Sequence, residues 1–385
     1  MSDYAGGEKT KQESFSVLPG LSRPGLFARS LSAHGLLIGF VLVYAFLYLI
    51  LLQFFPDSGP ENPMGLVIKL LATISILTVI SLFCQSCYEA FKRGGAKTPV
   101  SAIGQVFWQK IRDTQSSVPA FTMLVIMAAF SFVYVQVKKF IPVVAPFSWD
   151  EYFFELDKVL HFGVSPWKWL EPVFAGNPLL VSVLNFNYNI WFFVMWSLVV
   201  YFAFRVKDPV LRTRFFLTFF LAWAVGGSFL AMVFSSAGPA FYGRLGITPD
   251  VYAPLMAQLR EVNEVYSVWA LGLQDAMWLG YTGQGINIGI SAMPSMHNAA
   301  TMLFFMACWQ LNKKVGIGMA VHGILISIGS VYLGWHYAVD IYLGWAVALV
   351  AWYVSGFVAR WWHNRPDVRA FDDSRAGIDS LQHRA

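Results

Sequence analysis

Two histidines and an aspartate in the C-terminal third of the chain are the side chains best suited to catalysis. His336 and Asp340 occur in the stretch WHYAVD, residues 335–340, so on a helix they share one face and lie about one turn apart. A carboxylate at that spacing holds the imidazole in one tautomer and stabilises its charged form, which prepares a histidine for nucleophilic attack or proton transfer. His297 follows a Pro-Ser turn in the stretch PSMH, residues 294–297.

The sequence around these residues predicts two membrane-spanning helices joined by a hairpin. One apolar run follows PSMH, another precedes WHYAVD, and the polar residues 312–314 separate them. If both runs cross a bilayer, both histidines lie on the same side and at the same depth. A lone histidine at a helix end is most often an interfacial residue with a hydrogen bond. Two histidines at the same depth, one of them with an aspartate nearby, indicate a functional site, because ionisable residues are costly inside or at the edge of membrane helices.

The composition indicates a polytopic membrane protein. Of the 385 residues, 57% are hydrophobic and only 13% are charged, which excludes an ordinary soluble domain. Three cysteines, two of them in a single C-x-x-C, imply no disulfide framework. The basic cluster at 205–214 is explained by membrane topology, so no nucleic-acid partner is predicted.

The predicted fold class is all-α, a polytopic bundle of about eight transmembrane helices. The two runs described above are the sixth and seventh spans, and the others are expected at 35–55, 66–83, 119–137, 179–204, 215–234 and 341–358. The aromatic-rich segment 138–178 suits interfacial helices, and 251–278 suits an amphipathic helix.

The charge distribution predicts the orientation of the chain. Residues 1–34 are expected to form an N-terminal tail, and 361–385 a charged, unfolded C-terminal tail. With the N-terminus inside, 20 of the 27 Lys and Arg residues fall on the cytoplasmic side. This predicts an integral membrane protein with both termini in the cytoplasm. The two histidines, Asp340 and the segment 235–244 then lie on the periplasmic or lumenal side.

The motifs PSMH and WHYAVD resemble the second and third signatures of the type 2 phosphatidic acid phosphatase (PAP2) superfamily, which pairs P-S-x-H with a later H-x-x-x-D. The resemblance covers about residues 119–360 and implies a six-helix catalytic core made by spans three to eight. Residues 35–118 would be a two-helix N-terminal addition.

Carried over position by position, the resemblance assigns catalytic roles. His336 resembles the nucleophile that forms a phosphohistidine, and Asp340 resembles the carboxylate that orients it. His297 resembles the acid and base that protonates the leaving oxygen and then activates the acceptor, and Ser295 a donor to phosphate oxygen. A covalent phosphoenzyme splits one difficult displacement into two easier ones. The implied chemistry uses no metal and no cofactor.

The sequence departs from the phosphatase pattern at three places. The first motif, K-x-x-x-x-x-x-R-P, is absent; Ser330 occupies the place of an expected arginine; Met296 replaces a common glycine. These features resemble the inositolphosphotransferase branch, typified by fungal inositol phosphorylceramide synthase, as do AGPAFY at 237–242 and the segment 157–167. The phosphate-binding cation is then best sought at Arg244. Further candidates for substrate contact are Lys158, His161 and Tyr242, with Lys168 and Arg260 behind them.

The resemblance therefore implies a membrane phosphotransferase whose partners are a phospholipid donor and a lipid acceptor. The head group would be phosphoinositol-like and the acceptor ceramide-like. The alternative is a lipid phosphate phosphatase with the same residues and water as the acceptor. A transporter that uses His336 and Asp340 as a proton relay is a third hypothesis, but transport sites usually lie near the midplane between repeats.

Overall fold

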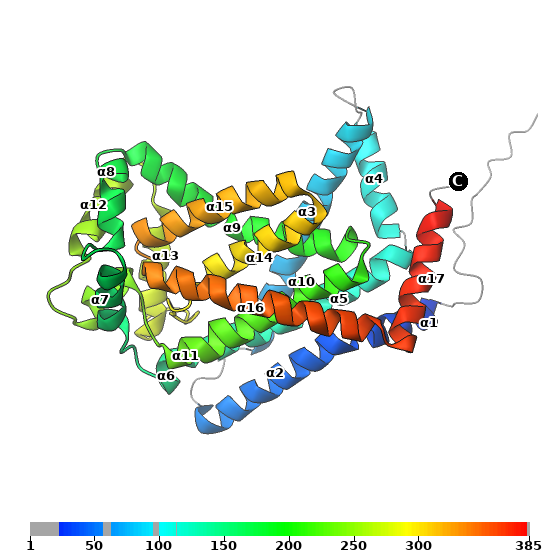
Figure 1. Ribbon diagram of the computed structural model, residues 1–385, viewed down its shortest axis with the longest axis horizontal. Helices are drawn as coiled ribbons and strands as arrows, with labels where there is room; N and C mark the ends of the chain where they lie inside the picture. The colour runs from blue at the N-terminus through cyan, green and yellow to red at the C-terminus, as the bar shows by residue number, and fades with distance from the viewer. Residues whose placement is uncertain (1–22, 57–62, 95–99, 113, 383–385) are drawn as a thin grey trace, which may run out of the picture.

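The computed structural model describes residues 23–56, 63–94, 100–112 and 114–382, and within those residues every regular element is helical. Figure 1 shows long helices running roughly side by side, with short helices gathered at one end of the bundle. The all-α fold predicted from the composition is confirmed.

Seven helices of the described residues are long and apolar enough to cross a membrane, so the chain is an integral membrane protein. They lie in α2 (Gly35–Phe54), α3 (Pro63–Gly94), α5 (Thr114–Lys139), α9 (Pro178–Phe204), α10 (Pro209–Leu221) with its continuation, α15 (Lys313–Tyr332) and α16 (Ala338–His363). The continuation of α10 is the π-helical segment η3 (Ala222–Leu230) and α11 (Ala231–Val233). All seven coincide with predicted spans.

The remaining predicted span is α14 (Met296–Leu311), a helix of 16 residues. It pairs with α15 and also packs on α10 and α16. Its buried face carries small residues and aromatics that allow close approach, among them Ala299, Ala300, Phe304 and Ala307. Gly344 of α16 also permits this contact, because a Cβ atom there would collide with the Ser295 carbonyl oxygen.

Short helices cover one end of the bundle (Figure 1): α6 (Ile141–Val144), α7 (Asp150–Leu160), α8 (Pro166–Phe174), α12 (Ala253–Val265) and α13 (Trp269–Tyr281). The predicted helix at 251–278 is therefore two helices. The break between them is stabilised by side-chain acceptors, since Asn263 accepts a hydrogen bond from the Val268 N–H group and Asn185 from the Ala270 N–H group.

The C-terminal segment differs from the prediction. Residues 361–385 were expected to form an unfolded tail. In the structure the first of them belong to the end of α16, and a further helix follows, α17 (Pro366–Gln382). His363 bonds to Asp372 at 2.6 Å, and Phe371 is buried with Leu26 of α1 (Arg23–Ala33). Helix α17 folds because its apolar residues pack on a distant part of the chain, which its own polar composition does not reveal. Residues 1–22 of the predicted N-terminal tail lie outside the described residues.

Candidate active site

The PSMH and WHYAVD motifs meet at the end of the bundle that the short helices cover. The N-terminus of α14 carries PSMH, and the connection from α15 to α16 carries WHYAVD. His336 is 5% exposed and Asp340 is fully buried. The rings of His297 and His336 are 5.8 Å apart between centroids, so the structure brings the two predicted histidines together.

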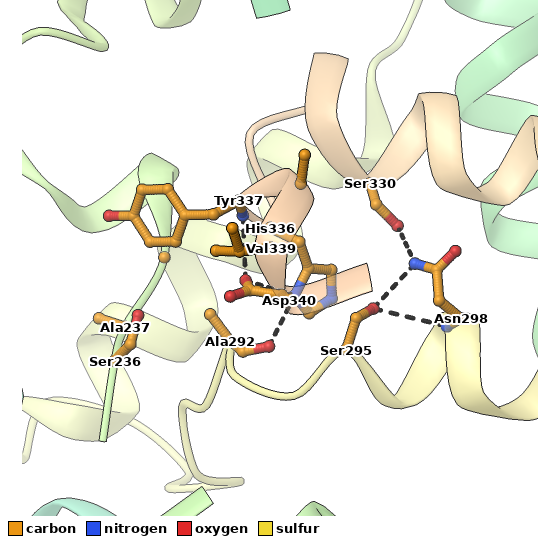
Figure 2. Close-up of polar contacts among 12 residues, drawn as sticks. Ser236, Ala237, Ala292, Ser295, Asn298, Ser330, His336, Tyr337, Val339 and Asp340 are labelled. Carbon is orange, nitrogen blue, oxygen red and sulfur yellow. Dashed lines mark hydrogen bonds and ion pairs between the residues drawn. The ribbon is translucent and has the colours of Figure 1, made fainter. Parts of the chain in front are cut away.

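The hydrogen bonds of His336 determine its tautomer. Its Nδ1 atom lies 2.8 Å from the Ala292 carbonyl oxygen and 3.3 Å from Asp340 Oδ2, as Figure 2 shows. A backbone carbonyl can only accept a hydrogen bond, so Nδ1 must carry the hydrogen. The Nε2 atom then keeps its lone pair and is the nucleophilic atom of the ring.

The electrostatic environment keeps this imidazole neutral. Burial lowers the pKa of His336 from its ordinary value to about 3; the hydrogen bond to Ala292 opposes the shift, and the positive charge of Lys138 adds to it. At neutral pH the ring is therefore uncharged, which is the state in which Nε2 can attack.

Ser295 is tied to the same residues. Its backbone N–H group donates to the Asp340 carbonyl oxygen at 2.9 Å, which joins α14 to α16. Its Oγ atom accepts a hydrogen bond from the Asn298 side-chain amide at 2.9 Å and one from the Asn298 backbone N–H group. Because both contacts are made to donors, the Ser295 hydroxyl hydrogen remains available for a substrate oxygen.

Asn298 was not predicted as a site residue, yet it organises the polar interior here. Its amide also donates to Ser330 Oγ at 2.8 Å (Figure 2), and its Oδ1 atom accepts from Ser327 Oγ at 2.6 Å. Both amide hydrogens are thus used inside the protein. Ser330, at the place of the arginine expected from the family pattern, is itself fully buried and belongs to this neutral network.

His297 faces the space beside His336 from the first turn of α14. Its ring packs against Trp191 at 4.4 Å and Tyr188 at 4.8 Å between centroids, both on α9. These two rings cover one side of the His297 imidazole.

Helix α7 positions the loop that carries His336, which the sequence did not predict. Asp157 accepts hydrogen bonds from the Ala338 and Val339 N–H groups at 2.8 and 2.9 Å. It therefore caps the N-terminus of α16, although it belongs to another helix. Burial raises the pKa of Asp157 to about 7, although those two N–H groups act in the opposite direction.

Asp150, two turns earlier on α7, is 1% exposed. It accepts hydrogen bonds from Ser236 Oγ, the Ala237 and Gly238 N–H groups and the Tyr337 hydroxyl, all between 2.8 and 3.0 Å. Burial raises the pKa of Tyr337 well above its usual value, which keeps the phenol protonated as a donor. One helix therefore holds the 235–238 loop and the nucleophile loop together.

The cationic candidates from the sequence occupy other environments. Arg244 forms an ion pair with Asp275 and lies over the rings of Phe241 and Trp278. Lys158 forms an ion pair with Glu155 at 2.9 Å. Neither forms a hydrogen bond with His297 or His336 within the described part of the chain.

The other two substrate candidates lie in the layer of short helices. His161 donates from Nδ1 to the Asp157 carbonyl oxygen at 2.6 Å and accepts at Nε2 from the Tyr342 hydroxyl at 2.7 Å. Tyr242 is buried against the rings of Tyr252 and Phe154. No ring contact or hydrogen bond joins them to the two site histidines among residues 114–382.

One basic side chain outside the predicted candidates is Lys138. It lies on the last turn of α5, and its charge acts on His336. In the sequence it is one of two adjacent lysines at the end of an apolar run, a pattern that also describes an ordinary interfacial anchor. His322 of α15 forms a hydrogen bond with Asn187 on the neighbouring α9 at 3.1 Å.

Fold and site together define a polytopic membrane protein with a two-histidine site at one end of its bundle. The sequence model of the PAP2 superfamily matches residues 151–354, more than half of the chain, and the chain belongs to that family. It is therefore an enzyme of the lipid phosphatase and phosphotransferase type. Separate comparisons with curated proteins and with solved structures found no match.

Proposed function

We propose that this protein is a lipid phosphotransferase that works through a phosphohistidine at His336. It would move a phosphoinositol-like head group from a phospholipid to the hydroxyl of a ceramide-like lipid. The observation that carries the proposal is the hydrogen bond from His336 Nδ1 to the Ala292 carbonyl oxygen, because it directs the lone pair of Nε2 toward the space shared with His297.

The first chemical step forms the phosphoenzyme. His336 Nε2 attacks the phosphorus atom, and the bond from phosphorus to the diacylglycerol oxygen breaks. Burial lowers the pKa of His297, so this ring takes up a proton together with the anionic phosphodiester and gives it to that leaving oxygen. The phosphorylated His336 ring then carries a positive charge, which Asp340 stabilises through the Nδ1–H group.

The second step returns the site to its starting state. Neutral His297 takes the proton from the acceptor hydroxyl, whose oxygen attacks phosphorus while the bond to His336 Nε2 breaks. In both steps the Ser295 hydroxyl donates to a phosphoryl oxygen, where negative charge develops.

The acceptor separates the transferase from the phosphatase, which would use water in the second step. Two features support the transferase. Aromatic rings of α9 pack on His297 and limit the access of water. Ser330 replaces the arginine of the phosphatase pattern with a neutral, internally bonded group.

A parallel assay tests the proposal. Purified protein in detergent is given fluorescent ceramide with phosphatidylinositol, or short-chain phosphatidic acid alone, and wild type is compared with His336→Ala. His322→Ala is the matched control, since it removes another buried imidazole of the bundle. We expect a new phospholipid from wild type and from the control, but not from His336→Ala.

Other outcomes would change the proposal. Inorganic phosphate released from phosphatidic acid, without any lipid product, would identify the phosphatase. Turnover that does not depend on His336 would refute the catalytic assignment.

We also propose that the site faces the periplasm or lumen, with both termini in the cytoplasm. The distribution of Lys and Arg supports this orientation. The site lies at the end of the bundle opposite α1 and α17 (Figure 1). Labelling single cysteines placed in α17 and in the 246–250 loop with a membrane-impermeant reagent would test it. We expect only the loop to react in intact cells.

A further inference from the structure

The indole ring of Trp191 lies against His297, the acid and base of the proposed reaction. The two ring centroids are 4.4 Å apart, and Tyr188, one turn earlier on α9, packs on the same imidazole at 4.8 Å. The indole N–H group of Trp191 is buried and has no hydrogen-bond partner among the described residues. An unpaired buried donor costs free energy, so its presence beside a reacting side chain indicates a ligand that pairs with it during function.

Helix α9 also borders the bilayer at this position. It is one of the apolar helices long enough to cross a membrane, and the next two residues, Phe192 and Phe193, are exposed on the surface of the described bundle. Trp191 itself is partly exposed. It therefore connects a lipid-facing stretch of α9 with the site, and a lipid whose chains run along α9 can bring its polar end to His297.

The chemistry of the indole limits what this ligand can be. An indole N–H group only donates a hydrogen bond, so its partner must be an acceptor. In the proposed reaction His297 serves first the oxygen of the leaving diacylglycerol and then the hydroxyl of the ceramide-like acceptor. Both lipids have a carbonyl group at the same distance along the chain from that oxygen. Two carbons and one further atom, an ester oxygen or an amide nitrogen, separate the reacting oxygen from the carbonyl carbon.

We propose that the Trp191 N–H group donates a hydrogen bond to this carbonyl, which is the sn-2 ester of the donor lipid and the amide of the acceptor. The assignment rests on the proposed function and names the part of the lipid that Trp191 recognises. One donor beside His297 holds both lipids in the same register, with the reacting oxygen near the imidazole. Trp191 thereby selects acyl lipids over lipids with an sn-2 ether, which has no carbonyl oxygen to accept the bond.

The test uses full-length protein in detergent and four donor lipids that share one head group. The donors have esters at both positions, ethers at both, an ester only at sn-2, or an ester only at sn-1. They are forms of phosphatidylinositol with ceramide as acceptor, or forms of phosphatidic acid if the wild type hydrolyses that lipid instead. Trp191→Phe removes the N–H group and keeps an aromatic ring. Trp196→Phe is the matched control, because the Trp196 N–H group is also buried and unpaired among the described residues but lies in the core of the bundle.

We expect the wild type to have a kcat/KM about fivefold higher for donors with an sn-2 ester than for donors with an sn-2 ether, the effect of one neutral hydrogen bond. The linkage at sn-1 should have no effect. Trp191→Phe should lose about fivefold in kcat/KM for the sn-2 ester donors and should turn over all four donors equally well. Trp196→Phe should keep the wild-type preference, and Tm with size-exclusion chromatography shows whether each variant is folded.

Equal kcat/KM of the wild type for sn-2 ester and sn-2 ether donors would overturn the proposal without any variant. A folded Trp191→Phe protein that keeps the sn-2 preference, or that loses the same factor for all four donors, would also overturn it, since the ring would then act only in packing.

A wild type without His336-dependent turnover would refute the proposed function instead. The increase in Tm caused by ester and ether forms of phosphatidylinositol would then decide the role of Trp191. A larger increase with the sn-2 ester form, lost in Trp191→Phe, would support the hydrogen bond to the carbonyl, and equal increases would overturn it.

Discussion

Replacing Asp340 with asparagine separates the charge at the nucleophile from its geometry. Asp340 Oδ2 accepts hydrogen bonds from His336 Nδ1 at 3.3 Å and from the Tyr337 N–H group at 3.0 Å. Asp340 Oδ1 has no hydrogen-bond partner among the described residues. The asparagine NH2 group can therefore take the Oδ1 position while its oxygen keeps both bonds, so that the substitution removes charge and leaves the contacts in place.

The distances set the expected size of the effect. Two unit charges 3.3 Å apart interact by about 5 kcal/mol at an effective dielectric constant of about 20. The amide dipole recovers part of this, and the Ala292 carbonyl, 2.8 Å from Nδ1, preserves the tautomer. We therefore expect kcat to fall by about 10²- to 10³-fold. In a serine-protease triad, where the aspartate sets the tautomer, the same substitution costs about 10⁴-fold.

Steady-state turnover of the lipid substrate that the wild type uses, with Tm measured in the same detergent, tests this reasoning. His336→Ala defines complete loss of the nucleophile. A loss smaller than about tenfold would show that the Asp340 charge does not stabilise the phosphohistidine. A loss equal to that of His336→Ala, at unchanged Tm, would show that the Ala292 carbonyl does not hold the tautomer.

Three further substitutions test other contacts of the site and fold. Asp157→Asn leaves one N–H group of the first turn of α16 without an acceptor, so we expect a loss of about 1–3 kcal/mol of stability, seen as a lower Tm. Burial raises the pKa of Asp157 to about 7, so between about pH 4 and pH 7 this carboxyl group is protonated in the folded state and ionised in the unfolded state. The stability of the wild type therefore falls as the pH rises through this window. The Tm difference between wild type and Asp157→Asn should therefore be larger at about pH 5 than at about pH 8, and the reverse trend would contradict the assignment. Ser295→Ala should lower kcat by about 10²-fold and stability by about 1 kcal/mol through loss of the α14 cap; wild-type turnover would exclude the hydroxyl as a donor. Asp372→Asn should weaken the docking of α17 through His363 and speed proteolysis after α16 without changing kcat, and unchanged proteolysis would show that the apolar contacts suffice.

Long-range contacts account for the parts of the site that the sequence did not predict. Asp150 and Asp157 look like ordinary acids of an amphipathic helix, and only the fold places them beneath loops from the second half of the chain. Asn298 follows His297 in the sequence, but its role depends on Ser330 from another helix. The sequence does contain one signal for Asp150 and Asp157. Both acids lie on the apolar face of the segment 150–160, where an acidic side chain needs hydrogen-bond partners.

The sequence by itself determined the class of the protein, the positions of its membrane spans and the identity of the two histidine motifs. Spans are readable because a bilayer demands long apolar helices whose backbone bonds are internal. Motifs are readable because chemistry requires given residue types at short spacing. The packing of α17, the cap from Asp157 and the contact of the Ala292 carbonyl with His336 were decided by the tertiary structure alone. Each joins residues far apart in the chain, and no local pattern records which distant surfaces meet.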